Sequence, residues 1–165
     1  MKRLKRVIIL ILLLIICFSV VSCGKNHEYI ASVVFKVRII ETPDDLPEGV
    51  QMYQFRPIHA DDYVEILDAN KGENASGYLS QIYEMLSLNF EDSLNSAGLT
   101  LSGLKESLLI KKVDENRISA TFSFDDEEMT NAVIHTMAEY LPKWISNCTV
   151  GEINVEEIKE AEQVS

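Results

Sequence analysis

The chain has 165 residues, of which 26 are acidic and 15 are basic, so its formal net charge is −11. An acidic surface of this kind repels nucleic acid and anionic lipid head groups, and neither is expected as a partner. Of the three cysteines, Cys148 alone lies beyond residue 24, which excludes an intramolecular disulfide and a CxxC metal site from that part of the sequence.

The N-terminus predicts a membrane segment. Four of residues 2–6 are basic, and a run that is apolar apart from Ser19 covers residues 7–21. A positive head before a short apolar stretch is typical of a secretory signal, because the cations stay in the cytoplasm while the apolar stretch enters the bilayer. With residues 22–24 included, the segment is long enough to span the hydrocarbon core, so a cleaved signal and an uncleaved anchor both fit.

Residues 20–24, Val-Val-Ser-Cys-Gly, resemble a bacterial lipobox, although such boxes prefer leucine where Val20 stands. In this interpretation residues 1–23 form the signal and lipobox, and Cys23 carries diacylglycerol and becomes the mature N-terminus. The alternative is a single span over residues 7–23, with Cys23 at the membrane interface. Either way, residues 24–165 are expected on the extracytoplasmic face of the cell membrane, since no later run of eighteen apolar residues returns the chain.

The first predicted element of this domain is a half-buried strand at residues 30–40. Apolar and polar positions alternate there, and β-branched residues are frequent. Prolines interrupt residues 41–73, which we interpret as a long ordered loop or insertion with a short helical turn between Asp61 and Ala69. Residues 75–97 follow with apolar positions at helical spacing, and Gly98 supplies a left-handed cap.

A second short helix is expected to end before Leu108, and a hairpin follows, with strands at residues 108–113 and 117–124. Asp125 can cap the next helix, whose apolar stripe runs from Met129 to Trp144, and Pro142 is expected to kink or end it. A strand near residues 152–159 completes the pattern. The order β-α-β-β-α-β predicts one α+β domain with a ferredoxin-like, split βαβ fold, both helices lying on one face of a four-stranded sheet.

The search for chemistry finds no catalytic, cofactor-binding or metal-binding residues. The histidines at 27, 59 and 135 lie far apart, and residues 59–62 are a poor metal site because three ligand-type side chains in a row rarely suffice. Residues 68–74 fail the calcium-loop pattern, since the glycine is one position early and Leu79 replaces the bidentate glutamate. Serine nucleophile motifs are missing as well. We therefore expect a protein that is not an enzyme, with Cys23 as its one modified residue.

Four segments occur in the order found in the polysaccharide chain-length determinants, the Wzz-type co-polymerases and related capsular tyrosine-kinase adaptors. They are an apolar strand soon after the membrane segment, a glycine-leucine stretch, a strand that leads into a helix, and an acidic closing strand, at residues 29–33, 97–105, 117–126 and 155–161. Residues 5–40 and 75–161 resemble this family.

The resemblance implies a non-catalytic scaffold in surface polysaccharide biosynthesis or export. Such a scaffold is anchored at its N-terminus, associates with copies of itself and works beside a polysaccharide polymerase or export partner. No proline-rich stretch and no second membrane span follow Ala161, so the resemblance implies a minimal, single-anchor member. A lipid-anchored, extracytoplasmic ligand-binding module of another pathway is the alternative function, because one fold serves many functions.

Overall fold

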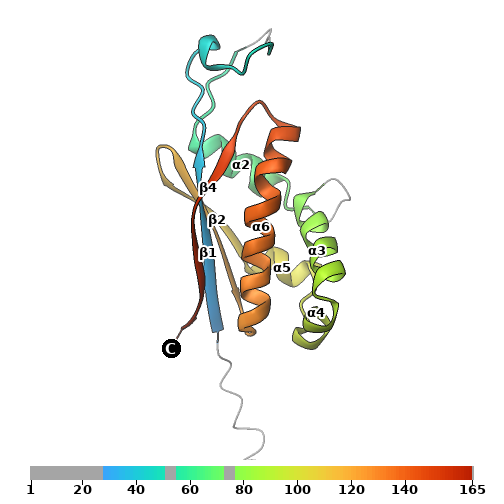
Figure 1. Ribbon diagram of the computed structural model, residues 1–165. Helices are drawn as coiled ribbons and strands as arrows, with labels where there is room; N and C mark the ends of the chain where they lie inside the picture. The colour runs from blue at the N-terminus through green and yellow to red at the C-terminus, as the bar shows by residue number, and fades with distance from the viewer. Residues whose placement is uncertain (1–27, 51–54, 73–76, 165) are drawn as a thin grey trace, which may run out of the picture.

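The computed structural model describes residues 28–50, 55–72 and 77–164. These residues form one sheet with helices gathered on one side of it (Figure 1). The strands are β1 (Glu28–Val37), β2 (Leu108–Asp114), β3 (Arg117–Phe124) and β4 (Ile153–Val164). The helices are α2 (Ala60–Ala69), α3 (Tyr78–Asn89), α4 (Glu91–Ala97), α5 (Leu101–Ser107) and α6 (Glu127–Cys148), and η1 (Pro43–Asp45) is a 3₁₀ turn. The expected mixture of helices with a four-stranded antiparallel sheet is confirmed.

The strands lie in the order β2-β3-β1-β4, and every neighbouring pair is antiparallel. β1 is therefore a central strand, paired with β3 along one edge and with β4 along the other. The β1–β4 pair changes register twice, between Ile30 and Ser32 and between Val34 and Phe35. Each change places an extra residue in β4, which disturbs the simple alternation of its side chains.

One face of the sheet forms the core. The inward positions of β1 and β3 alternate with polar or half-exposed positions, as expected for a sheet covered on one side. The buried side chains are Ala31, Val33, Phe35 and Val37 from β1, with Ile118, Ala120 and Phe122 from β3. Helix α6 packs on β1, β3 and β4, and α3 packs on α6, so the helical layer is itself two helices deep.

Helix α6 contains the apolar stripe predicted from the sequence, and its members from Met129 to Trp144 are buried except Tyr140, which is partly buried. Its cap is Asp126, one residue later than expected: the Asp126 carboxylate accepts the Met129 N–H at 2.7 Å. The helix also continues through Pro142 to Cys148. Proline costs one backbone hydrogen bond, but Trp144 and Ile145 beyond it are buried, and their burial outweighs that loss.

Several boundaries differ from the expectation, and β1 spans Glu28–Val37 instead of residues 30–40. The predicted helix over 75–97 is two helices, because Phe90 leaves helical geometry with φ −136° and ψ 37° between α3 and α4. Within 41–73, the short turn is a ten-residue helix, α2, that buries Ala60, Tyr63 and Leu67. Strand β4 extends to Val164, beyond the predicted end at 159.

Candidate functional site

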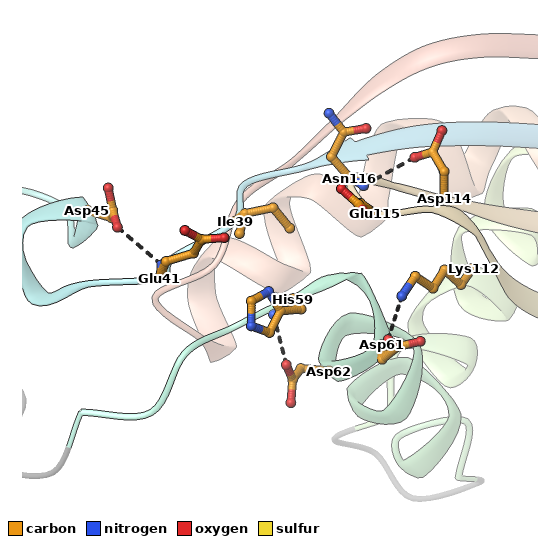
Figure 2. A pocket seen from close by; sticks show the side chains of 10 residues that line it. All are labelled: Ile39, Glu41, Asp45, His59, Asp61, Asp62, Lys112, Asp114, Glu115 and Asn116. Atoms are coloured by element: carbon orange, nitrogen blue, oxygen red, sulfur yellow. Dashed lines mark hydrogen bonds and ion pairs between the residues drawn. The ribbon is translucent and has the colours of Figure 1, made fainter.

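A cleft of about 1040 Å³ opens where the β2–β3 turn, the segment after β1 and the N-terminus of α2 meet (Figure 2). His59, Lys112 and Asn116 line it together with Ile39. Its other lining residues are all acidic: Glu41, Asp45, Asp61, Asp62, Asp114 and Glu115. Six of the residues that line this cleft are acidic, so its carboxylates decide what it can bind.

Asp45 stabilises the turn that carries it. Its carboxylate accepts the Thr42 N–H at 2.7 Å and the Thr42 hydroxyl at 2.8 Å, and it also accepts the Glu41 N–H at 3.1 Å. The hydrogen bonds from Thr42 are the main reason why the pKa of Asp45 is lowered. This carboxylate therefore stays ionised and is committed to the loop.

The two aspartates of α2 are also engaged. Asp62 accepts the His59 N–H at 2.8 Å and the Arg56 guanidinium at 2.7 Å, so it closes the first turn of the helix. Asp61 pairs with Lys112 of β2 at 2.6 Å, which ties α2 to the edge of the sheet. The sequence run from 59 to 62 is thus a helix start rather than a cluster of ligands.

Asp114 organises the β2–β3 turn. It accepts the Asn116 N–H at 3.1 Å and the Arg117 Nε–H at 2.7 Å. The Arg117 hydrogen bond is the first cause of the lowered pKa of Asp114, and the same contact raises the pKa of Arg117. Among the described residues, no group of three His, Cys, Asp or Glu side chains is arranged to hold a metal ion.

The cleft therefore offers a negative field and carboxylate oxygens. Glu41 and Glu115 project into it beside the engaged aspartates (Figure 2). Carboxylates accept hydrogen bonds from hydroxyl groups and attract cations, so the cleft suits a hydroxyl-rich or positively charged group. An anionic group would be repelled.

Of the remaining residues that the sequence singled out, those in the described ranges lie apart from this cleft. Cys23 and His27 fall outside the described residues. His135 is half exposed on α6 and lies 3.0 Å from Glu160 of β4, Nε2 to Oε1, so it belongs to the surface as expected. Residues 68–72 form the end of α2 and a turn in which Lys71 pairs with Asp68 at 2.6 Å.

Tyr63 is the residue near this cleft that sequence reasoning missed. It is fully buried on α2, and its hydroxyl donates to the Arg38 carbonyl at 2.7 Å and accepts the Glu152 N–H at 3.1 Å. It thereby joins the end of β1 to the start of β4. Its signal in the sequence was the spacing of Ala60, Tyr63 and Leu67, which is that of one helix face.

Across the described ranges, no helix is both long enough and apolar enough to cross a bilayer. The region predicted as the membrane segment, residues 1–23, lies outside those ranges. No protein-family model matches the chain, and a search of curated proteins gives no match.

Proposed function

We propose that this protein is a non-catalytic scaffold of the chain-length determinant type, acting in surface polysaccharide biosynthesis or export. It is held at the extracytoplasmic face of the cell membrane by a lipid on Cys23 or by a single span over residues 7–23. Copies associate in the membrane beside a polysaccharide polymerase or export partner. The folded part is a ferredoxin-like domain of the split βαβ kind.

The observation that carries the proposal is where three of the four segments of the family resemblance lie. Residues 29–33 are in β1, residues 117–126 cover β3 and the cap of α6, and residues 155–161 are in β4. β1 pairs directly with both β3 and β4, so three segments far apart in the sequence are neighbours in one sheet. The strand order β2-β3-β1-β4 supports the split βαβ assignment.

Two further features support a scaffold rather than an enzyme. The aspartates of the acidic cleft close turns and helix ends, so they are not free to transfer protons. Glu28, where β1 begins, follows Cys23 closely in the sequence, so the sheet stands near the proposed anchor. A domain held close to the bilayer meets other copies at high effective concentration.

The test is to delete the gene and to size the cell-surface polysaccharide. The proposal predicts a changed length distribution that the full chain restores, together with cross-linked oligomers in intact membranes. Residues 25–165 alone should remain largely monomeric at low salt, because the chain is strongly acidic. An unchanged polysaccharide and a monomeric anchored protein would together exclude the scaffold function.

The acidic cleft favours the second candidate, a lipid-anchored ligand-binding module. A volume of about 1040 Å³ accommodates a small ligand, and Glu115 and Glu41 face the space (Figure 2). A cationic or sugar ligand that raises the unfolding temperature would support this function if Glu115→Lys removes the effect. Glu84→Lys, on the exposed face of α3, is the matched control.

A further inference from the structure

The face of the sheet opposite the helices is open in the described structure. In Figure 1 the helices gather on one side of the sheet. The outward residues of β1 are Ile30, Ser32, Val34 and Lys36, which alternate with the buried core positions. Exposed apolar side chains also occur on β2, where Leu109 and Val113 are each almost half exposed. This face combines apolar and hydroxyl side chains on a regular surface.

The charges on this face are arranged by strand. The pairing registers align Lys111 of β2, Ser119 of β3, Val34 of β1 and Glu157 of β4 in one row across the sheet. Paired residues of neighbouring strands point to the same face, so all four side chains belong to the open face. A basic side chain therefore ends the row at one edge, and an acidic side chain ends it at the other.

A two-fold axis parallel to the strands, midway between β3 and β1, makes this row complementary to itself. Rotation places β2 over the partner's β4 and β3 over the partner's β1, while each row keeps its height. Lys111 then faces the partner's Glu157, Ser119 faces the partner's Val34, and both contacts occur twice. We propose that the open sheet face is the contact between two copies of this chain, packed face to face.

The neighbouring row fits the same arrangement. It consists of Leu109, Thr121, Ser32 and Lys159, so rotation places Leu109 over the partner's Lys159. A hollow of about 370 Å³ lies at that place, with Ser32, Ile30 and Lys159 in its lining. The exposed Leu109 side chain can enter this hollow and bury apolar surface against the lysine stem.

The remaining charges on the face do not prevent the contact. Lys36 and Arg117 would face each other across the axis, but Arg117 is already paired with Asp114 and lies 3.8 Å from Glu156. Lys111 has no ion pair among the described residues, and Glu157 has only a long, exposed contact of 3.9 Å to Lys159 of its own strand. In a chain of charge −11, two copies repel each other less at a face that carries both signs of charge.

The size of the face sets the strength of the contact. The face is four strands wide, at about 4.8 Å per strand, and eight residues long, at about 3.4 Å per residue. Its area is therefore roughly 500 Å² per copy, which is near the lower limit for specific interfaces. Such a dimer is weak in solution and needs confinement. The two-fold axis keeps both N-termini at the same end of the dimer, as two anchors in one membrane require. This step rests on the proposed function.

The test uses charge reversal in the full chain, reconstituted in vesicles of neutral lipid, with energy transfer between two fluorescent labels as the readout. Lys111→Glu and Glu157→Lys should each weaken association by about tenfold or more, because two attractive contacts become repulsive. An equal mixture of the two single variants should associate like the unchanged protein, since each reversed charge then meets its opposite. The double variant should also recover.

This recovery cannot arise within one chain. Lys111 and Glu157 are separated by three strand spacings, about 14 Å, which exceeds the screening length at physiological salt. Lys105→Glu on α5 and Glu84→Lys on α3 change the same charges on exposed helical positions and should leave association unchanged.

Association that persists in both single variants, or a mixture no better than either variant alone, would overturn the proposed contact. The scaffold function is judged separately by polysaccharide length in cells that carry the same variants. If the variants weaken association but polysaccharide length does not change, the proposed contact is supported and the scaffold function is excluded. If the variants leave association unaffected but polysaccharide length still depends on the protein, the proposed contact is excluded and the scaffold function is supported.

Discussion

Tyr63→Phe removes a hydroxyl that joins two ends of the sheet. The Arg38 carbonyl loses its donor at 2.7 Å, and the Glu152 N–H loses its acceptor at 3.1 Å. A buried backbone group without a partner costs about 1–3 kcal/mol. The side chains of Arg38 and Glu152 are exposed, so water can partly replace the hydroxyl, and we expect a total loss near 2 kcal/mol. Gly151 packs so closely that a Cβ there would lie 2.5 Å from the hydroxyl oxygen, which fixes the ring in place.

Tyr78→Phe is the matched control, because Tyr78 is equally buried and its hydroxyl has no hydrogen-bond partner among the described residues. Removing that hydroxyl should leave stability unchanged or raise it by up to about 1 kcal/mol. Urea unfolding measures both variants, followed by far-ultraviolet circular dichroism and by the fluorescence of Trp144, the single tryptophan. If Tyr63→Phe changes the unfolding free energy by less than about 0.5 kcal/mol, or both variants behave alike, the reasoning fails.

Three other predictions concern the anchor, the sheet and pH. Cys23→Ala should abolish fatty-acid labelling and leave an uncut precursor, and labelling that survives would leave the single-span anchor. Phe122→Asp should cost several kcal/mol in urea unfolding because it buries a lone charge, whereas Ser123→Asp on the open face should cost much less; equal losses would contradict the half-buried strand. Burial raises the pKa of Tyr63 and of Tyr78, so both hydroxyls stay protonated in the folded protein at a pH where they ionise in the unfolded chain. The free energy of unfolding is therefore unaffected by these groups below pH about 10 and falls above it. The urea midpoint should fall above that pH, and less steeply in Tyr78→Phe.

The sequence predicted the elements whose burial is one-sided and regular. The alternation around Phe35 and Phe122, and the stripe that includes Met129 and Trp144, each specify a single buried face. Strand β4 was predicted too short because it is an edge strand with two extra residues. Most of its side chains are exposed, so the end of the strand has no alternation to detect.

The site was harder to predict than the fold. Its residues come from three separate segments, around Glu41, His59 and Asp114, and no spacing within one segment indicates that they meet. The break at Phe90 was hidden for a related reason: apolar positions continue at helical spacing through it, so the pattern resembles one long helix. Both the assembly of the cleft and the helix break at Phe90 depend on tertiary packing, which a local pattern does not show.

The central position of β1 has a consequence for the order of folding. The β2–β3 hairpin and α6 are local structures, whereas β1 pairs with residues far along the chain. Glu28 pairs with Val164, and Tyr29 pairs with Phe124. Contacts of such long sequence separation form slowly, because their loop entropy is lost before the pairing is gained. In a chain exported as proposed above, the residues nearest the anchor cross the membrane first, so Val33 and Phe35 stay exposed on an unpaired strand for longest. Under that proposal, β1 is the strand that a chaperone would bind during export, and the strand at which aggregation would begin without one.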